Sequence, residues 1–268
     1  MAYLAVEGDR RIYYEHYRGS GRPVVLVHGW GMSVRVWDTT LPALLAAGHQ
    51  VVSLDHRACG SSDKDFEDVS IDTIGSDVAR LVGELGLNDV VLNGWSLGGA
   101  VVVDAGAKLG GNLAGLVLTG GATPKYLQGD GWQHGGTRDI FDQTIAALRD
   151  NRPEFLHALA EGVCHAEVGK ATIEWMWQIF MQTGPRADAA LADLGEIDQR
   201  KTLADLTVPV LVAHGTNDAI VPFDIGAEAA KLAPGGRLVQ FDQSGHAPFM
   251  EEGPKYRSEL LEFLASLG

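Results

Sequence analysis

One serine, Ser96, lies between two glycines in the segment GWSLG, residues 94–98, where a strand pattern gives way to a helix pattern. A sharp strand-to-helix turn displays such a serine at the carboxyl edge of a sheet, and flanking glycines avoid the clashes that side chains would make there. A serine hydroxyl becomes an effective nucleophile only when a nearby base takes its proton. The sequence therefore predicts Ser96 as a nucleophile and calls for an acid and a histidine further along the chain.

Asp218 and His246 have the expected types, order and positions. Asp218 follows the apolar run 209–213, and His246 follows the run 237–241, so both lie in loops at the carboxyl ends of expected strands. Open α/β sheets place their sites at that edge. Either residue alone is compatible with an ordinary turn or surface loop, but the order serine, acid, histidine predicts a catalytic triad.

A second glycine-rich loop, HGWG at residues 28–31, follows the apolar run 23–27. Acyl transfer needs backbone N–H groups aimed at the developing oxyanion. We expect the N–H groups of Trp30 and of Leu97, the residue after the nucleophile, to form this oxyanion hole. His28 is interpreted as a brace for the loop rather than as a second base.

Short apolar strands and helices alternate over the first 121 residues, which is typical of βαβ units and a mostly parallel sheet. Expected strands are 11–17, 23–27, 50–54, 89–94, 113–119, 209–213 and 237–241, and expected helices are 36–47, 71–85, 97–109, 225–232 and 254–267. Between 122 and 206 only helical patterns occur, at 138–149, 154–163, 173–181 and 187–194. We predict an α/β core, residues 1–121 and 207–268, with an inserted helical lid, residues 122–206.

Aromatic residues near these motifs and in the expected lid suggest an apolar substrate pocket. The residues predicted to contact substrate are Trp30, Trp95, Trp132, Trp175 and Phe180. The alternative for the lid residues is that they pack the lid onto the core. Basic residues in the lid are scattered, which does not favour a polyanionic or carrier-protein ester.

Five motifs, HGWG, DHR with GSS, GWSLGG, HGTND and GHAPF, together resemble those of the α/β-hydrolase superfamily over essentially the whole chain. The first, third and fifth are similar to pimeloyl-carrier-protein methyl esterases, and the second is similar to cofactor-free haloperoxidase-like esterases. The resemblance implies a doubly wound α/β-hydrolase fold. Because epoxide hydrolases and haloalkane dehalogenases carry aspartate where this chain has Ser96, the resemblance disfavours their chemistry. Ala58 and Cys59 depart from the common form of the second motif.

Composition restricts the partners. The 268 residues carry 21 basic and 35 acidic side chains, a formal net charge of −14, and only two cysteines. Such acidity disfavours nucleic acid and anionic membranes, because phosphate binding depends on clusters of Lys and Arg. No CxxC pair predicts a metal site, and no signal peptide or membrane span is recognised, so a cytoplasmic location is expected. Monomer and homo-oligomer both remain open.

The resulting hypothesis is a serine hydrolase that cleaves carboxylic esters of small to medium apolar acyl or aryl groups through an acyl-enzyme. It requires a small-molecule ester as its partner and no metal or organic cofactor. Two alternatives remain open. One is lactonase or perhydrolase activity, of the haloperoxidase type, from the same triad. The other is a non-enzymatic small-molecule receptor built on a hydrolase fold.

Overall fold

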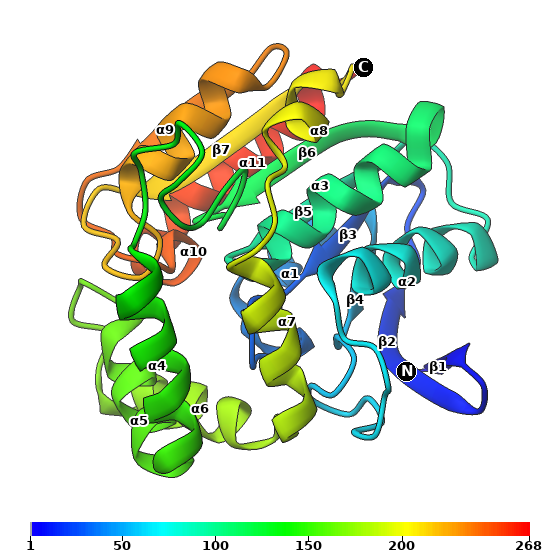
Figure 1. Ribbon diagram of the computed structural model, residues 1–268. Coiled ribbons are helices and arrows are strands. Elements are labelled where there is room, and N and C mark those ends of the chain that lie inside the picture. The colour runs from blue at the N-terminus through cyan, green and yellow to red at the C-terminus, as the bar shows by residue number, and fades with distance from the viewer. Residues whose placement is uncertain (1) are drawn as a thin grey trace.

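The computed structural model describes residues 2–268 and contains one eight-stranded sheet with the strand order β1-β2-β4-β3-β5-β6-β7-β8 (Figure 1). Neighbouring strands from β4 to β8 are parallel, whereas β2 pairs antiparallel with both β1 and β4. The strands are β1 Ala2–Glu7, β2 Arg10–Tyr17, β3 Gly21–Val27, β4 His49–Leu54, β5 Val90–Trp95, β6 Leu113–Thr119, β7 Val210–Gly215 and β8 Arg237–Phe241.

Helices cover both faces of the sheet. On β6, Leu116 faces α3 while its neighbour Gly115 lies against α11, because successive residues of a strand point to opposite faces. Figure 1 shows α2 and α3 in front of the strands and α11 behind them. The helices are η1 Val34–Thr39, α1 Leu41–Ala46, α2 Ile71–Glu84, α3 Leu97–Leu109, η2 Gly110–Asn112, α4 Arg138–Asp150, α5 Arg152–Gly162, α6 Lys170–Met181, η3 Pro185–Ala187, α7 Asp188–Leu194, α8 Arg200–Asp205, α9 Phe223–Leu232, α10 Pro248–Glu251 and α11 Gly253–Ser266.

The predicted doubly wound α/β fold with a mostly parallel sheet is confirmed. The single helix expected over 36–47 is wrong, because this segment forms η1 and then α1. Pro42 lies in the first turn of α1, where its missing N–H costs nothing, so the chain starts a new helix there. Within residues 2–268, no helix combines the length and apolar composition needed to cross a membrane.

A helical insertion, residues 120–209, connects β6 to β7 and contains α4, α5, α6, η3, α7 and α8. Figure 1 shows α4, α5 and α6 grouped beside the sheet, with α7 set apart from them. Helix α8 packs on α3 and α9 of the core rather than on the other helices of the insertion. The insertion thus occupies the chain segment expected for a lid, but its last helix is part of the core packing.

A buried ion pair fixes the loop after β4 to α2. Arg57 donates from Nε to Oδ2 of Asp77 at 2.6 Å and from Nη2 to Oδ1 at 2.9 Å. The two side chains are only 4% and 6% exposed. Nη1 of Arg57 also donates to Oε1 of Glu7 and to the carbonyl oxygen of Asp68, both at 2.9 Å. Because Asp77 is buried and supplies the bidentate contact, its loss would leave the buried guanidinium only partly compensated.

We predict that Asp77→Ala lowers the free energy of unfolding by about 3 kcal/mol, because it removes the bidentate partner of a buried guanidinium. Glu84→Ala is the control, since Glu84 pairs with Arg80 on the exposed surface of the same helix at 4.0 Å. That change should cost about 0–1 kcal/mol. Urea denaturation of both variants measures the difference, and equal losses would contradict the prediction.

Candidate active site

Ser96 sits on a strained turn between β5 and α3. Its backbone has φ 58° and ψ −125°, a region that side chains rarely adopt and that costs about 1–3 kcal/mol. The flanking glycines are required by close backbone contacts. A Cβ at Gly98 would lie 2.4 Å from the carbonyl oxygen of Val27, and one at Gly94 would lie 2.2 Å from the carbonyl oxygen of Gly98. The glycine pattern therefore has a steric cause at each position.

Asp218 and His246 are brought together from two loops at the carboxyl ends of β7 and β8. Oδ2 of Asp218 lies 2.8 Å from Nδ1 of His246, and both side chains are buried. Oδ1 of Asp218 accepts hydrogen bonds from the N–H groups of Ile220 and Val221 at 2.9 and 2.8 Å. The backbone thus fixes the carboxylate, and the carboxylate orients the imidazole with Nδ1 toward it.

Competing effects set the charge of Asp218. Burial raises the pKa of its carboxyl, but attraction to His246 and hydrogen bonds from His214 and His246 outweigh burial and hold the pKa well below its usual range. Nε2 of His214 lies 3.3 Å from Oδ2 of Asp218 and 2.9 Å from the carbonyl oxygen of Val221. Asp218 is therefore an anion at neutral pH.

Ser96 and His246 line the same cavity. Among residues 2–268, no direct hydrogen bond joins the Ser96 hydroxyl to His246. The indole of Trp95 donates to the carbonyl oxygen of His246 at 2.8 Å, which links the residue before the nucleophile to the histidine loop. Side chains that exchange a proton during a reaction are often less closely aligned without substrate, so this arrangement is compatible with proton transfer.

The two N–H groups predicted to form an oxyanion hole, those of Trp30 and Leu97, belong to residues that line this cavity. Neither N–H donates a hydrogen bond to another residue in the described part of the chain. Leu97 is the first residue of α3, where N–H groups have no partner within the helix. Both groups are therefore free to bind an oxygen in the cavity, and their catalytic role remains a prediction.

His28 braces the loop that carries Trp30, as expected from the sequence. Its Nδ1 lies 2.7 Å from the carbonyl oxygen of Gly29, and its Nε2 accepts from the N–H of His56 at 3.0 Å. Complete burial lowers the pKa of His28 to about 4. With both ring nitrogens occupied and the ring neutral, His28 is not available as a second base.

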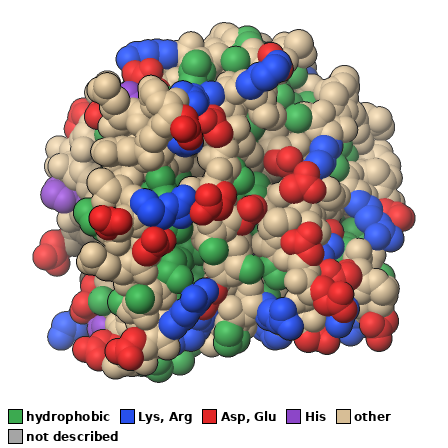
Figure 2. Space-filling model, in the orientation of Figure 1, with side chains coloured by type: hydrophobic (Ala, Val, Ile, Leu, Met, Phe, Trp, Pro, Cys, Tyr) green, Lys and Arg blue, Asp and Glu red, His purple; other side chains and the backbone are tan. Residues whose placement is uncertain are grey.

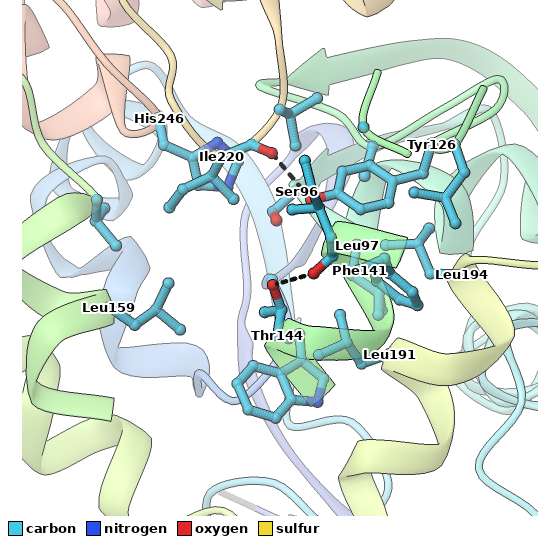
Figure 3. Close-up of a pocket in the computed structure, with 18 of the residues that line it drawn as sticks. Ser96, Leu97, Tyr126, Phe141, Thr144, Leu159, Leu191, Leu194, Ile220 and His246 are labelled. Atoms are coloured by element: carbon cyan, nitrogen blue, oxygen red, sulfur yellow. Dashed lines mark hydrogen bonds between the residues drawn. The ribbon is translucent and has the colours of Figure 1, made fainter. Parts of the chain in front are cut away.

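The cavity is apolar apart from the residues at its inner end. Its volume is about 150 Å³, the size of an apolar cavity that holds one benzene molecule. The hydroxyls of Tyr126 and Thr144 donate to the carbonyl oxygens of Ile220 and Ile140, so they do not present free donors. Figure 3 shows Ser96 between His246 and Leu97, with Leu159 and Leu191 on opposite sides of the cavity. Such walls suit an uncharged, apolar group attached to a reacting carbonyl.

Three of the five residues predicted to contact substrate, Trp30, Trp95 and Phe180, line the cavity. Trp132 and Trp175 do not. Paired backbone hydrogen bonds with Gly129 hold Trp132 in a tight turn, where it is buried against His134. Trp175 lines a separate groove on the other side of α6. The sequence pattern places an aromatic on a helix but does not determine which neighbour that helix faces.

Sequence reasoning missed most of the apolar wall. Many of the missed residues lie on single helical faces, with spacings of three or four: Ile140, Phe141 and Thr144 on α4, Phe155 and Leu159 on α5, and Leu191 and Leu194 on α7. Others, such as Tyr126 and Ile220, lie in loops. This spacing marks a buried helix face, but not whether the face meets a cavity or the core. Figure 2 shows hydrophobic side chains recessed among interspersed acidic and basic ones on the face seen in Figure 1.

The motif resemblance is confirmed by comparison with known proteins. The family model described as alpha/beta hydrolase fold matches residues 22–253. A non-heme haloperoxidase of Rhodococcus erythropolis is 30% identical, with 99% of this chain and 100% of that protein covered. A pimeloyl-[acyl-carrier protein] methyl ester esterase of Vibrio cholerae is 30% identical, with 93% and 97% covered. The solved structure of an esterase from Exiguobacterium antarcticum has a TM-score of 0.94, 28% identity and 98% of each chain covered.

Gly98→Ala should disrupt the turn that carries Ser96, because the added Cβ meets backbone oxygens that cannot move independently. We predict a loss of about 3 kcal/mol in the free energy of unfolding, or failure to fold. Gly83→Ala is the matched control in α2, where a Cβ meets nothing within 4 Å. That change should stabilise by about 0.5 kcal/mol. Thermal unfolding compares the two variants, and a stable Gly98→Ala protein would contradict the steric argument.

Proposed function

The chain belongs to the α/β-hydrolase fold family, and from that membership we propose that it is a serine esterase. One observation carries the proposal. Ser96, on a strained turn, shares an apolar cavity with His246, whose Nδ1 is paired with the Asp218 carboxylate. This is the arrangement of nucleophile, base and orienting acid that acyl transfer requires.

In the first half of the proposed reaction, Nε2 of His246 takes the proton of the Ser96 hydroxyl while Oγ bonds to the ester carbonyl carbon. The carbonyl oxygen becomes an anion and accepts hydrogen bonds from the N–H groups of Trp30 and Leu97. Each such bond is worth about 3–4 kcal/mol of transition-state stabilisation. The Asp218 carboxylate stabilises the imidazolium. The bond to the alcohol oxygen then breaks, and His246 returns the proton to the leaving alcohol.

In the second half, His246 takes a proton from water as the water oxygen bonds to the acyl carbon. The tetrahedral intermediate again places its oxyanion at the same two N–H groups. When it collapses, the bond to Oγ breaks and His246 passes the proton from water to Ser96, which releases the carboxylic acid. The serine proton has left with the alcohol and a proton from water replaces it, so the cycle needs no cofactor.

The proposed substrates are esters of small to medium apolar acyl or aryl groups. The cavity wall offers them aromatic and aliphatic side chains from α4, α5, α6 and α7, and the available polar groups gather near Ser96. The helical insertion supplies most of this wall, and we propose that it acts as the lid. Among residues 2–268, no lysine or arginine lines the cavity to meet a polyanionic ester.

Perhydrolysis is a second candidate function, favoured by the similarity to a protein named as a haloperoxidase. In that reaction hydrogen peroxide replaces water as the attacking group, and a peroxy acid replaces the carboxylic acid as product. The same serine, histidine and aspartate would serve both reactions. Measuring peroxy acid and carboxylic acid together, at increasing peroxide concentration, separates the two.

We predict that a fluorophosphonate probe labels wild-type protein at Ser96, since the activated hydroxyl attacks phosphorus as it attacks a carbonyl. Ser96→Ala should abolish labelling and lower kcat for 4-nitrophenyl esters by roughly 10⁴-fold or more, because the nucleophile is lost. Ser61→Ala, at an exposed position, is the control and should retain both. Mapping of the adduct by mass spectrometry identifies the site. Absence of labelling in folded wild-type protein would overturn the esterase proposal.

A change of the cavity wall should alter chain-length preference. We predict that Leu159→Trp lowers kcat/KM for a 4-nitrophenyl octanoate roughly tenfold or more while leaving the acetate within about twofold, because the indole fills space that only the long acyl group uses. Ala158→Trp places the same indole on the exposed side of α5 and is the control. A parallel loss for both esters would contradict this assignment of the acyl pocket.

A further inference from the structure

The carboxylate of Glu251, the last residue of α10, joins two segments that are distant in sequence. Its Oε1 accepts hydrogen bonds from the N–H groups of Gly245 and Ala247, at 3.0 and 3.1 Å. Its Oε2 accepts from the N–H groups of His165 and Ala166, at 2.7 and 2.8 Å. A carboxylate offers about four acceptor positions, so the side chain is fully occupied by backbone donors.

The two segments also contact each other directly. The N–H of His246 donates to the carbonyl oxygen of Val163 at 2.9 Å. A Cβ at Gly245 would lie 2.8 Å from the backbone nitrogen of His165, so only glycine allows this approach. The contact segment, residues 163–166, thus lies directly on the loop that carries His246. It connects α5 to α6 within the helical insertion.

We propose that Glu251 is a positioning residue for the proposed esterase reaction, acting through the backbone of residues 245–247 to align the His246 ring with Ser96. This inference rests on the proposed function. Asp218 fixes one point of the ring, at Nδ1, and the Trp95 ring packs against the imidazole with 5.4 Å between the ring centroids. A further constraint comes from the backbone, where the N–H groups of 245 and 247 bind Glu251 and that of 246 binds the contact segment.

The neighbouring Glu252 allows a positioning role to be separated from simple stabilisation of the loop. Oε2 of Glu252 accepts from the N–H of Gln243 at 3.0 Å and from the hydroxyl of Ser244 at 2.7 Å. It therefore binds the preceding part of the same loop with the same chemistry. Its hydrogen bonds reach neither the residues flanking His246 nor the contact segment.

The test compares Glu251→Gln with Glu252→Gln in the full chain. The glutamine NH₂ at position 251 would face N–H donors. The hydrogen bonds that Glu251 accepts from residues 165–166 or 245–247 would then be lost, while side-chain size is kept. We expect Glu251→Gln to lower kcat roughly 10–100-fold with KM changed less than about twofold, since a misplacement of about 1 Å costs this much. Fluorophosphonate labelling of Ser96 should slow by the same factor. Glu252→Gln should lower the melting temperature about as much as Glu251→Gln does, but should keep kcat within about twofold of the wild-type value.

Equal kcat values for wild type and a folded Glu251→Gln protein would overturn the inference, as would an equal loss in both variants. If Glu251→Gln does not fold, Gly245→Ala opens the same contact from the other side and should give the same fall in kcat without a change in KM. An unchanged kcat in folded Gly245→Ala protein would also overturn it.

Hydrogen exchange of the wild-type protein tests the hydrogen bonds from residues 165 and 166 to Glu251 without reference to activity. The amides of residues 165 and 166 should be protected relative to that of Glu167, and exchange at the same rate would overturn the inference. Failure of the esterase proposal can be told apart from failure of this inference. In the first case the wild-type protein itself is inactive and unlabelled, whatever the exchange rates show.

Discussion

Close backbone packing around the Ser96 turn is the constraint on which the rest of the site depends. Helix α3 starts so near to β3 that Gly98 lies against the carbonyls of Val27 and His28, and a Cβ at Gly99 would lie 2.7 Å from Gly121. The carbonyl of Ser96 accepts from the N–H groups of Gly99 and Ala122, at 2.8 and 2.9 Å. These contacts over-determine the turn, which is how a strained conformation persists in a folded protein. The same packing brings the loop of Trp30 to the nucleophile.

Electrostatics divides the three histidines near the site into different roles. His28 is fully buried without a carboxylate partner among its hydrogen bonds, so burial lowers its pKa to about 4 and the ring stays neutral. His246 and His214 both face Asp218, whose ionised form they stabilise. His214 is fully buried and has no access to the cavity, whereas His246 lines it. Only His246 therefore combines a carboxylate partner with access to a substrate.

Sequence reasoning predicted the core and where the candidate reacting groups lie because these positions follow from local rules. The buried strand before Ser96, the glycines around it and the loops of Asp218 and His246 each have a pattern that short-range sterics dictates. The wall of the cavity has no such pattern. Phe155 and Leu159 lie on a helix face like any buried face, and Trp175 occupies a similar position yet faces another groove. Which apolar face borders a cavity depends on how α4, α5 and α7 pack together, which is a tertiary property.

The helical insertion contributes more than a cover for the cavity. The hydroxyl of Thr183 donates to the carbonyl oxygen of Gly31 at 2.6 Å, and the indole of Trp30 donates to the carbonyl oxygen of Ala187 at 2.9 Å. At the other side, Val163 accepts from the N–H of His246. The insertion therefore holds both the loop that carries Trp30, the proposed oxyanion donor, and the loop that carries His246, the proposed base. A rigid-body displacement of the whole insertion would break these bonds, so the insertion is tied to both loops of the core.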